Sequence, residues 1–191
     1  MAIKTKLTGA FDLLFLFGRG IHAFSGARRA ALRSLLIPAA LFPLTLPFTY
    51  FYPPKGMESG YPYSQILATV VVQAALSLIF SLALVALLAR AFNRLNKFWL
   101  FLEAGNWTAL AMFGISLPLL LAAACGWLPR EEMDRIFVIV QCYFYVVTGC
   151  IVFRSFRLNW QLSIFITVAI LFADQTAWDL LFRLQGIPRP W

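Results

Sequence analysis

Three polar side chains fall within long apolar segments of the chain: Gln73, Gln141 and Asp174. At about 1.5 Å of rise per helical residue, each lies about 8 to 12 Å below the same face of a membrane. Ionisable groups inside a membrane are costly and usually face the bundle interior or a wet cavity. Two interpretations stay open: a polar pocket or ion path that opens to the outside, or interhelical hydrogen bonds that hold the bundle together.

A second polar cluster, formed by Glu103 and Asn106 and extended by Thr108, lies near the opposite face. Glu103 is expected to form an ion pair with one of the arginines Arg90, Arg94, Arg154 or Arg157, which would lock three helices together. Alternatively, these arginines bind a lipid phosphate and Glu103 orients them. The candidate ligands for lipid headgroups are Arg28, Arg29, Arg33, Arg90, Arg94, Arg154 and Arg157.

Catalytic and metal-binding motifs are missing from the sequence. It has a single histidine, His22, and no HExxH, GxSxG or P-loop motif. Asp174 and Asp179 are five positions apart, so on one helix they point about 140° away from each other, which argues against an aspartyl dyad. The cysteines Cys125, Cys142 and Cys150 have neither metal-ligand nor CxxC spacing. We therefore expect no enzyme activity, no metal and no cofactor.

The composition indicates a membrane protein. Of the 191 residues, 61% are hydrophobic and only 13% are charged, and the mean hydropathy is +0.79. The net charge of +8 would suggest nucleic acid in a soluble protein. In a membrane protein such charge lies in connections that face anionic lipid, so we expect anionic phospholipid as a partner and no nucleic acid.

The hydropathy pattern predicts an all-α, polytopic transmembrane helical bundle. The first span contains three prolines and is expected to be kinked or locally unwound. The last has only twelve apolar residues before Asp174, so a re-entrant or interfacial segment is the alternative to a full crossing. The five predicted spans are 35–52, 66–89, 98–124, 136–153 and 162–182, and the membrane domain extends over 35–185.

The first 34 residues form a basic segment, and its apolar run is too short to span a membrane. Apolar residues at helical spacing predict an amphipathic helix that lies in the membrane interface. The run Phe11–Phe17 contains Asp12 and is followed by Gly18-Arg19-Gly20, which argues against a signal peptide. Residues 186–191 are expected to form a short tail.

The distribution of charge predicts an orientation. With the N-terminus inside, eleven of the sixteen cations fall on the inner side, and the outer connections hold Lys55, Arg130, Arg135, Arg183 and Arg189. The positive-inside rule then places the N-terminus in the cytoplasm and the C-terminus outside, which suits a bacterial inner membrane. The inner cations are Lys4, Lys6, Arg19, Arg28, Arg29, Arg33, Arg90, Arg94, Lys97, Arg154 and Arg157.

A five-span bundle with a basic amphipathic lead-in resembles the Yip1-type membrane proteins and their small bacterial relatives in topology, over about residues 27–185. The resemblance implies a non-enzymatic adaptor or organiser of the membrane. We therefore expect an accessory or scaffold protein that binds lipid and either a membrane-protein partner or a second copy of itself. The alternative is a small transporter or channel subunit that uses Gln73, Gln141 and Asp174.

Overall fold

The computed structural model describes residues 3–54, 56–57 and 60–186, which contain helices and no strand. Lys55 and Arg189, which entered the charge count, lie outside the described residues, as does the predicted tail beyond Gly186. In order, the helices are α1 (Ile3–Leu14), η1 (Gly18–Ala23), α2 (Arg28–Ser34), α3 (Leu36–Thr45), α4 (Phe48–Phe51), α5 (Tyr63–Ala91), α6 (Leu95–Ala124), α7 (Arg130–Phe156) and α8 (Trp160–Gln185).

Four helices, α5 to α8, are long and apolar enough to cross a membrane. They contain four of the five predicted spans, and each extends past the predicted bounds because the helix continues beyond the apolar run into polar residues. Local chemistry sets their ends: Pro62 and Pro129 immediately precede α5 and α7, the Asn159 side chain accepts a hydrogen bond from the Leu162 amide, and Gly186 ends α8 with a φ of 65°. Asp174 and Asp179 therefore lie within one continuous helix.

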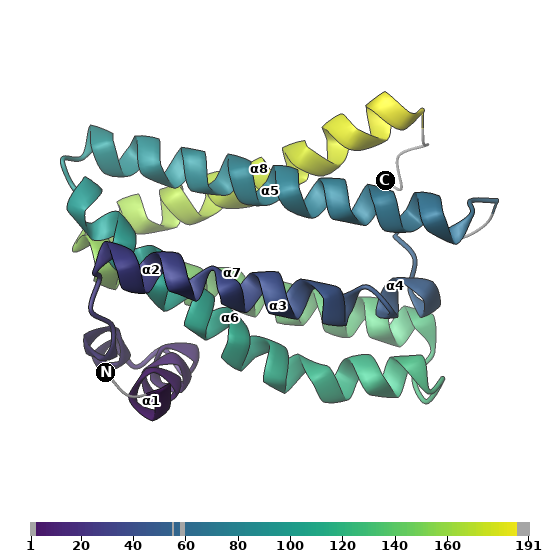
Figure 1. Ribbon diagram of the computed structural model, residues 1–191, viewed down its shortest axis with the longest axis horizontal. Helices are drawn as coiled ribbons and strands as arrows, with labels where there is room; N and C mark the ends of the chain where they lie inside the picture. Colours follow the sequence, from purple (N-terminus) through teal and green to yellow (C-terminus); the bar gives the residue numbers. More distant parts are fainter. Residues whose placement is uncertain (1–2, 55, 58–59, 187–191) are drawn as a thin grey trace.

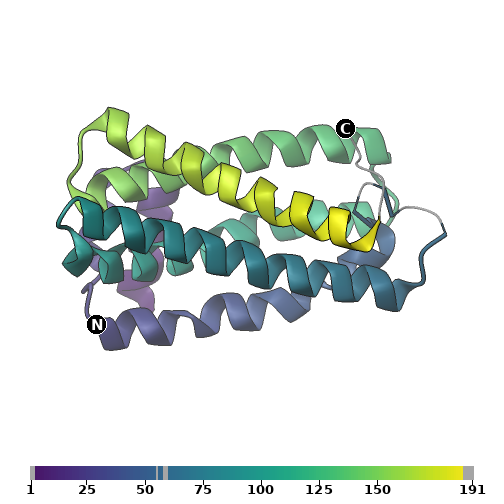
Figure 2. The same cartoon turned by 90° about the horizontal axis from the view of Figure 1, so that it is seen from above.

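The predicted first span, 35–52, is not one long helix but a row of short ones, α3 and α4, preceded by α2. Proline accounts for the interruptions, because Pro38 has no backbone N–H to donate to Ser34 across the break at Leu35, and Pro47 has none to donate to Pro43 across the break before α4; Pro43 itself lies inside α3. The junction residues Leu35, Leu46 and Pro47 nevertheless keep right-handed helical angles. The row therefore runs on along one side of the bundle, packed against α6 (Figures 1 and 2).

The N-terminal segment, α1 and η1, lies across one end of the bundle (Figure 1). The single amphipathic helix predicted there is wrong in detail, since the helix ends at Leu14 and Leu16 adopts a φ of 63°. Tyr143 of α7 donates a hydrogen bond to the Leu14 carbonyl, which satisfies one of the acceptors at the end of α1. η1 turns back against α1, where an added Cβ at Gly20 would come within 2.4 Å of the Gly9 oxygen.

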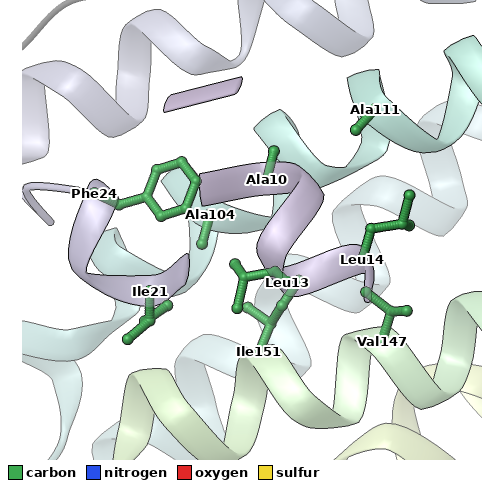
Figure 3. Close-up of a cluster of buried hydrophobic side chains, with 9 residues drawn as sticks. All are labelled: Ala10, Leu13, Leu14, Ile21, Phe24, Ala104, Ala111, Val147 and Ile151. Carbon is green, nitrogen blue, oxygen red and sulfur yellow. The ribbon is translucent and has the colours of Figure 1, made fainter. Parts of the chain in front are cut away.

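A buried cluster joins this N-terminal segment to the long helices. Leu13, Leu14 and Ala10 of α1 are at most 1% exposed. Figure 3 shows how they meet apolar side chains of α6 and α7. The segment is thus part of the packed core on one side, while Phe11, Phe15 and Phe17 remain 42–60% exposed on the other. The full cluster is Ala10, Leu13, Leu14, Ile21, Phe24, Ala104, Ala111, Val147 and Ile151.

Candidate functional site

Asp174 of α8 is linked to α5 by hydrogen bonds. The Ser77 hydroxyl donates to Asp174 Oδ1, and Gln73 Nε2 donates to the same oxygen at 3.4 Å. Gln73 and Ser77 are one helical turn apart on α5, so both side chains face the same side. The structure therefore brings together Gln73 and Asp174, as predicted, and adds Ser77, which the i,i+4 spacing from Gln73 could have revealed.

These side chains border a cavity of about 430 Å³ between α5, α6, α7 and α8, here called the Asp174 cavity. Asp174 lies fourteen residues from the start of α8, about 21 Å along the helix axis. Ser77 lies the same distance from the end of α5, so the cavity is at mid-membrane depth if both helices span. Its polar lining residues are Gln73, Ser77, Ser81, Asn106, Thr108, Tyr145, Thr148 and Asp174.

Gln141 is not part of this cavity lining. It is an exposed residue of α7 and lies one helical turn before Tyr145, close enough for the two side chains to interact. The predicted layer of three polar side chains is therefore reduced to two, and Tyr145 takes the position nearer the cavity. Equal depth placed Gln141 in that layer, but depth along a helix does not specify which face the residue occupies.

Glu103 of α6 is fully buried and pairs with Lys6 of α1, with 2.7 Å between Oε1 and Nζ. Its other oxygen accepts hydrogen bonds from the Ser25 hydroxyl at 3.1 Å and the Gly26 amide at 3.0 Å. The predicted partner was therefore wrong, since Glu103 binds the N-terminal segment instead of Arg90, Arg94, Arg154 or Arg157. Asn106 Nδ2 donates to Ser34 Oγ at 2.9 Å, which ties α6 to α2.

The predicted headgroup ligands share one end of the bundle, where α1, the α5–α6 connection and the α7–α8 connection meet (Figure 1). All seven of their side chains are exposed. Two of them stack on aromatic rings, Arg28 over Trp99 at 5.5 Å and Arg154 over Phe153 at 5.1 Å from the ring centroid. We call this the basic end, defined by Arg28, Arg29, Arg33, Arg90, Arg94, Arg154 and Arg157.

A groove of about 530 Å³ runs along α7 and α8 from the basic end. Its floor holds small side chains, among them Gly149, Ser163 and Thr167, so the two helices approach closely there. Arg154 and Trp160 also line it, and Trp160 is 63% exposed at the start of α8. An apolar groove with a cation and an indole matches the amphiphilic shape of a phospholipid.

No protein-family model, curated protein or solved structure matches this chain. The resemblance to Yip1-type proteins therefore stays a prediction. Function has to be argued from the cavity, the groove and the basic end alone.

Other chemistry is sparse in the described part of the chain. No group of three or more His, Cys, Asp or Glu side chains there could hold a metal ion. His22 is exposed and lies in a surface hollow beside Asp12 and Arg19. Asp12 accepts two hydrogen bonds from Arg19 and raises the pKa of that guanidinium. Arg19 is exposed and Asp12 is half-buried, and neither residue lines the Asp174 cavity.

Proposed function

We propose that this protein is a non-enzymatic accessory or scaffold protein of the membrane, which binds anionic phospholipid at its basic end. The observation that carries the proposal is the collection of seven exposed arginines at one end of four long apolar helices. Each basic residue near an anionic membrane surface contributes about 1 kcal/mol of attraction. Together these arginines favour a stable shell of anionic lipid around that end.

The row α2–α4 provides a fifth membrane crossing in this proposal. Residues 28–51 are helical or in helical turns, and their uncharged part, 34–51, extends about 27 Å at about 1.5 Å for each of its 18 residues. That length is close to a hydrocarbon core of about 30 Å, with Arg28, Arg29 and Arg33 left at headgroup level. Asn106 donates a hydrogen bond to Ser34, and the row packs against α6 along its length.

Five crossings place the two ends of the chain on opposite sides of the membrane. The cations predicted to lie inside are found in α1, η1 and α2, in and around the α5–α6 connection, and in and around the α7–α8 connection. These parts share one end of the bundle (Figure 1), so one membrane face is strongly basic. By the positive-inside rule this face is cytoplasmic, with the end of α8 outside, as in a bacterial inner membrane.

The groove between α7 and α8 is the proposed position of one bound phospholipid. Arg154 would contact its phosphate, Trp160 would lie at headgroup level, and an acyl chain would follow the apolar floor. A membrane-protein partner or a second copy completes the scaffold role, and this part rests on the Yip1-type resemblance. Affinity purification from native membranes in mild detergent tests it: a stoichiometric partner supports it and a lone monomer contradicts it.

Native mass spectrometry of lipid retained by the purified protein tests lipid binding. We expect anionic phospholipid to be enriched over zwitterionic lipid, and Arg154→Gln with Arg157→Gln to lose most of it. Arg183→Gln is the matched control, because Arg183 is an exposed arginine at the other end of α8. Equal retention by the double variant and the control would remove the support for a headgroup site.

The Asp174 cavity favours a second candidate function, a small transporter or channel subunit. Here the polar side chains at mid-membrane depth line a solute path rather than merely tying α5 to α8. Flux of a solute or ion into reconstituted vesicles tests this function, with Asp174→Asn as the variant. Loss of flux with an unchanged melting temperature supports it, whereas a lowered melting temperature alone indicates a structural role for Asp174.

A further inference from the structure

The Asp174 cavity contains an acid without a basic partner. The groups that hydrogen-bond to the carboxylate are the Ser77 hydroxyl and the Gln73 amide, both neutral. Among the described residues that line the cavity, none is lysine or arginine. A carboxylate at mid-membrane depth is costly unless a positive charge accompanies it. A cationic ligand would supply the charge that the protein does not.

A second observation also indicates a ligand. Thr108 lines the same cavity, is 1% exposed, and its hydroxyl has no hydrogen-bond partner among the described residues. A buried hydroxyl without a partner is less stable than one that is satisfied, because it has lost its hydrogen bond to water. The cavity is therefore incomplete as a purely structural contact, because the Asp174 carboxylate has no positive partner there and the Thr108 hydroxyl has no hydrogen-bond partner among the described residues.

The remaining lining specifies what kind of cation would fit. Phe101, Phe144 and Tyr145 contribute aromatic rings, and eight of the other sixteen lining residues are aliphatic. Aromatic faces attract cations that have lost water, quaternary ammonium groups above all. The volume of about 430 Å³ lies in the range of small-molecule pockets and is far larger than an inorganic ion needs.

We propose that the Asp174 cavity binds a small organic ammonium cation, with Asp174 as its counter-ion and the rings of Phe101, Phe144 and Tyr145 as its aromatic wall. This proposal deepens the second candidate function by naming its ligand class. Cation binding is measured without flux and in neutral lipid, so a positive result does not depend on anionic-lipid retention or on transport. Conversely, flux of another solute into vesicles does not require this cation to bind, so the two proposals fail separately.

The test is equilibrium binding of radiolabelled tetraethylammonium to the full chain in phosphatidylcholine nanodiscs. We expect saturable binding that weakens by more than about 30-fold in Asp174→Asn, the loss typical when one partner of a desolvated charge pair is removed. Glu132→Gln, which removes an exposed charge at the start of α7, is the control and should bind as the native protein does. Absence of saturable binding by the native protein, or equal binding by Asp174→Asn, would overturn the proposal.

A second pair of variants decides the matter if Asp174→Asn does not fold. Gly105 and Gly114 both lie on α6, and an added Cβ at either meets nothing within 4 Å. Gly105 lines the cavity, whereas Gly114 is exposed outside it. Gly105→Leu should therefore fold and abolish binding, while Gly114→Leu should bind normally. Retained binding by Gly105→Leu, or displacement of the probe by an equal concentration of Na⁺, would contradict an organic-cation site.

Discussion

Lys6 on α1 and Glu103 on α6 form an ion pair with 2.7 Å between Nζ and Oε1, in which the glutamate side chain is fully buried and the lysine is 15% exposed. The same carboxylate accepts hydrogen bonds from Ser25 and Gly26. One buried acid thus attaches α1, the connection before α2, and α6. A predicted interfacial helix is thereby fixed to the bundle instead of lying loosely on the membrane.

Lys6→Met is expected to destabilise the protein by about 3 kcal/mol, because it leaves Glu103 buried without its cation. Thermal unfolding in detergent measures the effect as a lower melting temperature. Lys4→Met on the same helix is the control, since Lys4 is exposed.

The double variant Lys6→Met with Glu103→Gln should recover much of the lost stability. The amide oxygen can still accept from Ser25 and Gly26, and no charge is then left unpaired. If the single and double variants melt together, the Lys6–Glu103 pair contributes little and the apolar cluster alone holds α1.

Close packing between α1 and η1 predicts a second effect. A Cβ at Gly9 would lie 2.2 Å from the Ala23 Cβ, and one at Gly20 would lie 2.4 Å from the Gly9 oxygen. Gly20→Ala meets backbone that cannot move away, so we expect a loss of about 1–3 kcal/mol and faster protease cleavage of the N-terminal segment.

Gly114→Ala is the matched substitution in open space. It should raise stability by up to about 1 kcal/mol through helix propensity. Equal stability of Gly20→Ala and Gly114→Ala would show that η1 does not pack against α1 as described.

The exposed phenylalanines of the N-terminal segment predict where it meets the membrane. Phe15 is 60% exposed beside the buried Leu13 and Leu14, which places its ring on the side away from the core. A spin label at Phe15→Cys, in a background without the native cysteines, should collide more often with oxygen than with a water-soluble nickel complex. A label at Thr5→Cys, which lies in the polar hollow beside Asp12, should show the reverse. Similar collision rates at both positions would contradict an interfacial orientation.

Hydropathy predicted the long helices well because apolar length is a local property. The predicted span 66–89 lies inside α5, and 162–182 lies inside α8, with the difference confined to polar ends where proline, asparagine and glycine set the boundaries. Proline likewise predicted the interruption of 35–52. The charge count does not depend on helix ends, so the single basic end could also be anticipated.

Contacts between distant segments could not be read from local pattern. Lys6 is the partner of Glu103, although they are 97 positions apart and four arginines lie closer in sequence. Gln73 and Asp174 meet because both occupy inward faces, whereas Gln141 at similar depth faces outward. The sequence grouped Thr108 with Glu103 and Asn106 and did not predict that it lines the same cavity as Asp174, since a threonine in an apolar helix usually bonds to its own backbone.

The three cysteines offer a direct test of the proposed orientation. Cys125 is exposed where α6 ends, on the side of the bundle opposite the basic end. Cys142 and Cys150 lie within the apolar part of α7. Maleimides react with thiolate, which forms in water and not in hydrocarbon. In spheroplasts, a membrane-impermeant maleimide should therefore label Cys125 and no other native cysteine. Arg90→Cys in a Cys125→Ala background should be labelled only after permeabilisation. The opposite pattern would place the basic end outside and reverse the orientation of all the crossings.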